Sequence, residues 1–132
     1  MAKLQLLPDE VVLRRASTAY LKARLKLVPG EAVVTQRRFV HVGQLRATAA
    51  AGVLGLLAGG RVDVDVALTT LARLDRSRHG RGQAWTLTTT AGEEYKLLGD
   101  LDDWRPAFED ALSRGGRRLV EQQAGSWDVV PA

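Results

Sequence analysis

A stretch of alternating residues, 62–98, constrains the fold of this chain more than any other feature of its sequence. In 62–68 an apolar side chain stands at every second position, and Asp63 and Asp65 lie between them. This period of two is typical of a strand that buries one face. The segments that follow are a bend at 67–71, a strand at 72–76, a glycine-rich turn at 77–82, and strands at 85–90 and 94–98. The stretch predicts a small curved β-sheet, in which the three strands after the bend form a meander.

A segment nearer the N-terminus, 19–28, alternates in the same way. It places leucine and alanine on one side and Lys22, Arg24 and Lys26 on the other. A helix would scatter these cations around its circumference, so the pattern predicts one strand with a cationic outer face. The Pro29-Gly30 pair then predicts the turn that ends this strand.

Residues 32–42 predict a further strand. Its two faces are expected to carry Val34, Val40 and Val42 on one side and Arg37, Phe39 and His41 on the other. Ahead of both strands, Pro8-Asp9-Glu10 and the apolar run 11–13 predict a turn that opens a short first strand. The chain is therefore expected to be mainly β.

The one predicted helix comes late in the sequence. Trp104, Phe108 and Leu112 recur every four residues, which predicts a helix packed onto the sheet. Asp102 or Asp103 is the expected cap, and Pro106 is expected in the first turn, where a missing N–H is harmless. After this helix, 117–123 predicts one or two further helical turns, and 125–131 predicts an extended tail anchored by Trp127.

The charge of the chain is unevenly distributed. The formal net charge is +4, but 14–81 holds thirteen basic and four acidic residues, whereas 82–132 holds five basic and nine acidic ones. Such asymmetry favours an anionic partner, such as a membrane surface or nucleic acid, or else a solvated cationic face. Aromatic residues make up only 5% and stand mostly at expected core positions, so nucleic acid is the less favoured partner.

The segment 43–60 interrupts the β pattern with an alanine-rich run and then an apolar run between glycines. Its fourteen uncharged residues, 47–60, fall short of the roughly 20 that a membrane-spanning helix needs. The N-terminal apolar run is also cut by Pro8-Asp9-Glu10 before it reaches signal-peptide length. We therefore expect a cytoplasmic protein, able to lie at the inner face of the membrane.

Little in the chain indicates catalysis. His41 and His79 are the only histidines, and neither has a second ligand at metal-binding spacing. Asp63 and Asp65 are expected on one strand face and could act as acid and base, but no nucleophile accompanies them, so solvated carboxylates are the simpler interpretation. With no cysteine, thiolate chemistry is excluded. We predict no metal, no cofactor and no enzymatic activity.

Five short pieces of the chain form a series. They are Leu7-Pro8-Asp9-Glu10-Val11-Val12, Val34-Thr35-Gln36-Arg37-Arg38-Phe39-Val40, Val66-Ala67-Leu68-Thr69-Thr70-Leu71, Thr89-Thr90-Ala91-Gly92-Glu93-Glu94-Tyr95, and the tryptophan-led helix 104–114. In this order they resemble the GRAM branch of the pleckstrin-homology-like superfamily. Ala67 stands where the family has proline, and the second piece is one residue longer than usual.

This resemblance implies a mainly β fold, a curved antiparallel β-barrel or sandwich capped by one C-terminal helix. The domain would span 1–114 with the apolar insert 43–60, and 115–132 would be a C-terminal tail. Related domains bind phosphoinositides, peptides or other proteins, so the fold alone does not define the ligand.

Two sets of residues are candidates for binding. The cationic set, for an anionic ligand, is Lys22, Arg24, Lys26, Arg37, Arg38, Arg76, Arg78, His79 and Arg81. The apolar set, for a partner protein or a membrane, is Val53, Leu54, Leu56 and Leu57. A solvated sheet face and an insert folded over the sheet are the structural alternatives. The sequence thus predicts a non-enzymatic adaptor that recognises an unknown protein partner or self-associates, and alternatively a peripheral binder of anionic lipid.

Overall fold

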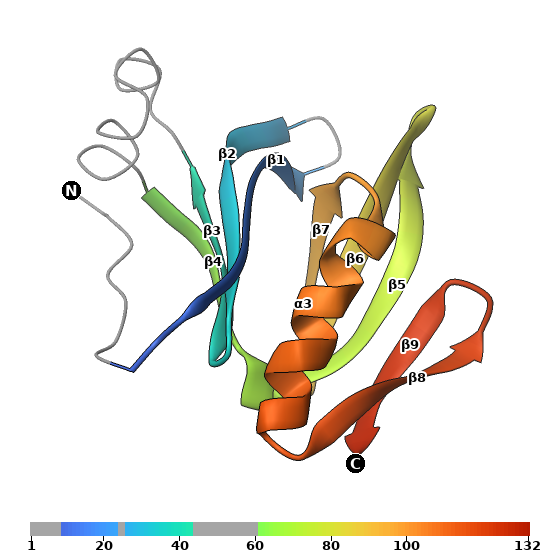
Figure 1. Ribbon diagram of the computed structural model, residues 1–132. Coiled ribbons are helices and arrows are strands. Elements are labelled where there is room, and N and C mark those ends of the chain that lie inside the picture. Colours follow the sequence, from blue (N-terminus) through green and yellow to red (C-terminus); the bar gives the residue numbers. More distant parts are fainter. Residues whose placement is uncertain (1–8, 24–25, 44–60) are drawn as a thin grey trace.

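The computed structural model describes residues 9–23, 26–43 and 61–132, which form one antiparallel sheet and one α-helix (Figure 1). In chain order the elements are β1 (Val12–Ala23), β2 (Lys26–Thr35), β3 (Arg38–Gly43), β4 (Arg61–Ala67), the short 3-10 helix η1 (Leu68–Thr70), β5 (Leu71–His79), β6 (Gly82–Thr89), β7 (Glu94–Leu98), α3 (Leu101–Arg114), β8 (Arg117–Gln123) and β9 (Ser126–Pro131). The predicted mainly β fold with one long helix is confirmed at this level.

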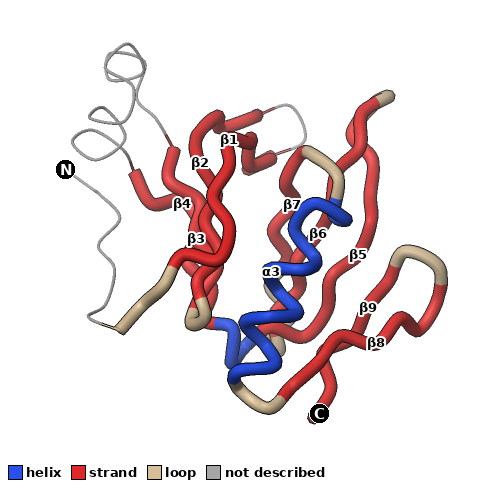
Figure 2. The backbone as a smooth tube through the Cα atoms, viewed as in Figure 1, coloured by secondary structure: helices blue, strands red, loops and turns tan. Residues whose placement is uncertain are grey.

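The sheet has the strand order β4-β3-β2-β1-β7-β6-β5-β9-β8, with antiparallel neighbours throughout. Strand β1 joins two groups of strands, β4-β3-β2 on one side and β7-β6-β5-β9-β8 on the other. It runs along the whole of β2 and then bends over to pair with β7 through Tyr20 and Leu21 (Figure 1). Helix α3 lies between the two groups of strands in this view and contacts β1, β2 and β8 (Figure 2).

The two long strands predicted at 19–28 and 32–42 are wrong, because each is a hairpin. Strand β1 pairs antiparallel with β2 up to Ala23 and Lys26, and β2 returns as β3 after Gln36 and Arg37. A two-residue turn normally reverses the alternation of faces. Between β1 and β2 a register irregularity after Leu21 cancels this reversal. Leu21 pairs with Leu27, so the apolar and polar residues of the two strands alternate along the sequence as they would in a single strand.

Between β2 and β3 the reversal is not compensated. Val34 pairs with Phe39, and Ala32 pairs with His41, so these four side chains share one face. Val40 and Val42 turn to the other face, where they form a separate buried pair. The predicted grouping of Val34 with Val40 and Val42 is therefore wrong.

Gly30 lies inside β2, not in the predicted turn. It pairs with Thr18 on one side and with Gly43 on the other. A Cβ atom at Gly30 would lie 2.1 Å from the carbonyl oxygen of Val42, a distance that no side chain can adopt. The glycine therefore allows the backbones of β2 and β3 to approach closely.

The three-stranded meander predicted after the bend is present as β5, β6 and β7, with η1 at the predicted bend, whereas β4 pairs with β3 at the other edge of the sheet. Val64, Val66 and Leu68 are buried as expected, whereas Val62 is 37% exposed. The register between β3 and β4 shifts after His41, because His41 pairs with Val64 while its neighbour pairs with Val62. This register shift is a bulge at Asp63, the residue between these two pairs.

Helix α3 begins earlier than the apolar pattern indicates. Its cap is Asp100, whose carboxylate accepts a hydrogen bond from the backbone N–H of Asp102 at 2.9 Å. The predicted caps Asp102 and Asp103 are therefore wrong, and both lie in the first turn. Pro106 lies in the second turn for the same reason, not in the first as predicted.

The predicted stripe of α3 is buried against the sheet. Trp104, Phe108 and Leu112 are each 3% exposed or less. Phe39 of β3 lies among these side chains, with its ring 5.8 Å from that of Phe108, 6.1 Å from that of Trp104 and 5.5 Å from that of Trp85. This aromatic cluster joins both groups of strands to the helix.

The chain after α3 forms a hairpin. The predicted helical turns at 117–123 are wrong, because this segment is strand β8. Strand β9 is extended, as predicted for 125–131, but it pairs with β5 and so belongs to the sheet. Trp127 is the expected anchor: it is 5% exposed, and the guanidinium groups of Arg76 and Arg105 lie over its ring at 5.0 and 4.7 Å.

Candidate functional site

The structure separates the predicted cationic set into two groups. In the first, the guanidinium is paired with a carboxylate: Arg37 with Asp9, Arg38 with Glu10 and Asp65, and Arg76 with Asp102 at 2.5 Å. Hydrogen bonding by Asp102 raises the pKa of Arg76, and hydrogen bonding by Arg76 lowers that of Asp102. These cations already have partners within the fold.

The most buried of these pairs joins the start of the chain to the turn between β2 and β3. The Glu10 side chain is fully buried, and Arg38 donates to it from Nε at 2.9 Å and from Nη2 at 3.1 Å. Thr35 donates its hydroxyl hydrogen to the same carboxylate at 2.6 Å and accepts from the backbone N–H groups of Arg37 and Arg38, each at 3.1 Å. Hydrogen bonding to Glu10 raises the pKa of Arg38. This arrangement fixes the turn.

The second group lies at the opposite end of the molecule, and we call it the cationic hairpin end. It consists of Lys22 of β1, Lys26 of β2, Arg78 of β5, Arg81 of the β5–β6 turn and Lys96 of β7. In the described ranges no carboxylate lies within ion-pair distance of these five cations. Lys22, Lys26, Arg78 and Arg81 are exposed, and His79 beside them is half-buried.

Lys96 connects the two hairpins of this end. Its ammonium donates to the carbonyl oxygen of Arg78 at 2.6 Å, and its backbone pairs with Leu21 of β1. Figure 1 shows the end of β1, the start of β2 and the β5–β6 turn at the same end of the molecule. Sequence reasoning missed Lys96, although its position next to the buried Leu97 indicates an outward side chain.

The two strand carboxylates Asp63 and Asp65 do not lie together, which corrects the prediction. Asp65 is exposed and pairs with Arg38 at 3.2 Å. The bulge in β4 turns Asp63 towards His41, and its side chain is only 6% exposed. The arrangement predicted for an acid and a base on one open strand face is therefore absent.

His41 is fully buried on β3. Its Nε2 lies 3.3 Å from the carbonyl oxygen of Thr18, and its Nδ1 lies 3.7 Å from Oδ2 of Asp63. A carbonyl oxygen can only accept, so Nε2 carries the hydrogen and Nδ1 faces the carboxylate. Burial lowers the pKa of His41 below 6.5, and this effect outweighs the opposing effects of Thr18 and Asp63.

We expect the stability of the protein to fall as the pH drops below 6.5. Above that value His41 is neutral in both states and contributes no pH dependence. Below it the unfolded chain binds a proton that the folded His41 does not, so the free energy of unfolding falls until the folded pKa is reached. Urea unfolding between pH 7.5 and 5 measures this slope, and His41→Gln should flatten it.

The matched control for this prediction is His79→Gln, which removes a histidine from the hairpin end and leaves His41 with its neighbours Thr18 and Asp63, so the slope caused by His41 should remain. The two variants are compared by the pH dependence of their free energies of unfolding and not by the absolute values, because replacing a buried side chain lowers stability at every pH. An unchanged slope in His41→Gln would show that another group causes the pH dependence.

Several predicted residues lie outside the part of the chain that the structure describes. They are Arg24 of the cationic set and Val53, Leu54, Leu56 and Leu57 of the apolar set, with almost all of the insert 43–60.

Within the described ranges no helix is long and apolar enough to cross a membrane. No family model matches the chain, and no curated protein matches it.

Proposed function

We propose that this chain is a pleckstrin-homology-like module of the GRAM type, without enzymatic activity, that attaches to an anionic membrane surface through its cationic hairpin end. The site would lie at the inner face of the cytoplasmic membrane. The observation that carries the proposal is a group of cations on two hairpins and on β7 between them, for which the described part of the chain provides no carboxylate partner.

The fold part of this proposal is supported by how the motif residues meet. Glu10 belongs to the first motif of the resemblance, and Thr35 and Arg38 belong to the second. These two motifs are joined by the buried carboxylate of Glu10. The β4–η1–β5 bend and the helix α3 follow in the order that the resemblance implies.

The ligand part is supported by charge and by exposure. Near an anionic leaflet each lysine or arginine contributes about 1 kcal/mol of attraction, so five such cations suffice for reversible attachment. Nucleic-acid binding commonly uses exposed aromatic side chains that stack on bases. The core buries Trp85, Trp104 and Phe108, so a membrane is favoured over a nucleic acid as the anionic partner. A protein-partner or self-associating role through the insert stays a prediction, since the residues concerned lie outside the described ranges.

Sedimentation with lipid vesicles tests this proposal. We expect the protein to pellet with vesicles that contain phosphatidylserine, not with neutral vesicles, and to be released at high salt. The combined replacement of Lys22, Arg78 and Arg81 by alanine removes three of the contacts. At about 1 kcal/mol each, this should weaken binding roughly hundredfold.

The matched control replaces Arg15, Arg73 and Arg114 by alanine. These arginines are also exposed, but each is paired with a carboxylate elsewhere on the surface. The control has the same net charge as the test variant and should bind vesicles nearly as well as the unmodified protein. If both variants lose binding equally, net charge alone drives it, and the hairpin end is not the site.

A further inference from the structure

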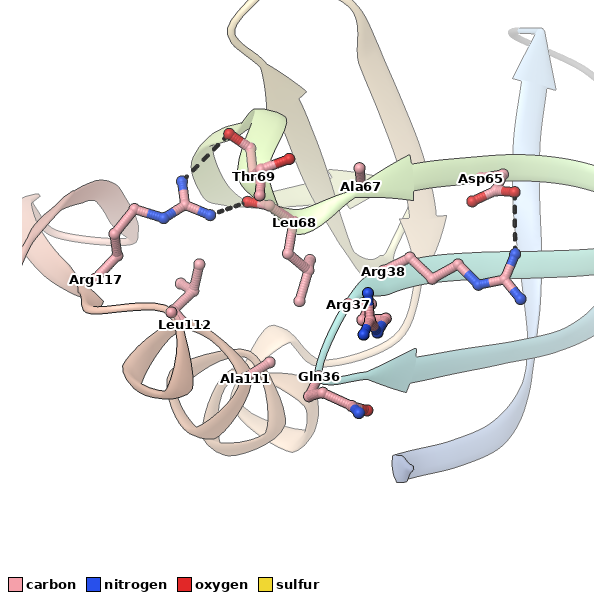
Figure 3. Close-up of a pocket in the computed structure, with 11 residues that line it drawn as sticks. Gln36, Arg37, Arg38, Asp65, Ala67, Leu68, Thr69, Ala111, Leu112 and Arg117 are labelled. Carbon is pink, nitrogen blue, oxygen red and sulfur yellow. Dashed lines mark hydrogen bonds and ion pairs between the residues drawn. The ribbon is translucent and has the colours of Figure 1, made fainter. Parts of the chain in front are cut away.

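A concave site lies at the other end of the molecule from the cationic hairpin end, near the β2–β3 turn. It is a cavity of about 390 Å³ between η1, the last turn of α3 and the start of β8. Its apolar lining consists of Ala67, which is exposed, and of a floor of three core residues that are each 3% exposed or less, Leu68, Ala111 and Leu112. Figure 3 shows these three residues lying between Arg117 and the turn. The volume lies at the lower end of the range for small-molecule sites, which is about 300–1,000 Å³.

The charges around this cavity are not balanced by its own lining. Three arginines and one aspartate line it, which gives the lining a formal charge of +2, three minus one. Arg37 and Arg38 are neutralised from outside by Asp9 and Glu10. Figure 3 shows the Arg38 side chain directed along the strands to Asp65, away from the apolar lining.

Arg117 is different, because its partners are uncharged. Its guanidinium donates to the carbonyl oxygens of Leu68 and Thr69, the latter at 3.5 Å. These two bonds hold the group at the rim without cancelling its charge. Within the residues that the structure describes, no carboxylate forms an ion pair with Arg117. A guanidinium has five N–H donors, so further donors remain for a ligand.

We propose that this cavity binds a free small-molecule carboxylate with an apolar body, such as a medium-chain fatty acid. The apolar part would lie against the exposed Ala67, over the floor that Leu68 and Leu112 form, and the carboxylate would accept hydrogen bonds from Arg117. A neutral ligand would leave the charge of Arg117 unmatched, and a cationic one would be repelled by it. The proposal does not rest on the membrane function, which concerns the opposite end.

Calorimetric titration of the full chain with octanoate, below its micelle concentration, tests the proposal. We expect saturable binding with a negative heat-capacity change, which marks apolar burial. Octanol has the same chain without the charge, and acetate has the charge without the chain. Both should bind at least about tenfold more weakly, because each loses one half of the recognition.

Two variants locate the site. Arg117→Gln should weaken octanoate binding about tenfold, whereas Arg118→Gln, which alters the exposed neighbour outside the cavity, should leave it unchanged. Ala67→Phe fills the cavity from an exposed strand position and should abolish binding without disturbing the hydrogen bonds of Arg117. This variant keeps the test decisive if Arg117→Gln fails to fold.

Three results would overturn the proposal. The first is an absence of saturable octanoate binding to the unmodified chain. The second is equal affinity for octanoate and octanol, because Arg117 then contributes nothing. The third is full affinity in Ala67→Phe combined with loss of binding in the variant of Lys22, Arg78 and Arg81, which would place octanoate at the cationic hairpin end.

Discussion

Replacing Glu10 by alanine is expected to lower the free energy of unfolding by about 3–5 kcal/mol, the usual cost of removing one partner from a buried ion pair. The Glu10 carboxylate is fully buried and accepts hydrogen bonds from Arg38 and Thr35. Without it the Arg38 guanidinium, which is 19% exposed, loses its buried counter-charge. Urea unfolding followed by tryptophan fluorescence measures the loss.

Asp65→Ala provides the matched control, because Asp65 pairs with the same guanidinium at 3.2 Å but is 49% exposed. Exposed ion pairs contribute about 0–1 kcal/mol, so this variant should remain close to the unmodified protein. A double-mutant cycle between Glu10→Ala and Arg38→Met should return a coupling energy well above that for Asp65 and Arg38. Equal losses in the two single variants would contradict a special role of the buried carboxylate.

Phe39→Ala is the second large expected effect, also about 3–5 kcal/mol, because removing a buried phenylalanine loses transfer energy and leaves a cavity. The ring is fully buried and lies within 5.5–6.1 Å of the rings of Trp85, Trp104 and Phe108. Two indoles border the lost ring, so the fluorescence spectrum of the folded state should change as well. Thermal unfolding and emission spectra measure both effects.

Val62→Ala is the control for the aromatic cluster. Val62 lies on the neighbouring strand β4 but is 37% exposed, so its truncation should alter stability by no more than about 0.5 kcal/mol. A loss in Phe39→Ala as small as that in Val62→Ala would mean that the aromatic side chains repack to fill the space.

The sequence predicted the elements that depend on local periodicity. The strand at 62–68, the meander after it and the stripe Trp104, Phe108 and Leu112 are all present, because their neighbours in space are set by a spacing of two or four along the chain. The antiparallel pairing of β1 with β2 and the turn at 36–37 were missed. An irregularity near Leu21 hides the first, and the second is fixed by the Thr35 side chain and not by a glycine or proline signal.

The features that depend on distant residues could not be predicted in this way. Glu10 and Arg38 are 28 positions apart, and nothing in either segment reveals that they meet. The bulge that separates Asp63 from Asp65 follows from the register between β3 and β4. For the candidate site, the cations of the hairpin tips were named from sequence, whereas Lys96 and the cavity beside Arg117 required the packing of separate elements.

The bend of β1 has a consequence for how this protein emerges from the ribosome. The hydroxyl of Thr18 donates to the carbonyl oxygen of Leu98, 80 positions later, and Tyr20 pairs with Leu97. A nascent chain can therefore pair β1 with β2 early. The other edge of the bent end of β1 has no strand to pair with until β7 has been synthesised. Contacts of such sequence separation slow folding, so closure of the sheet is expected to be a late, post-translational step.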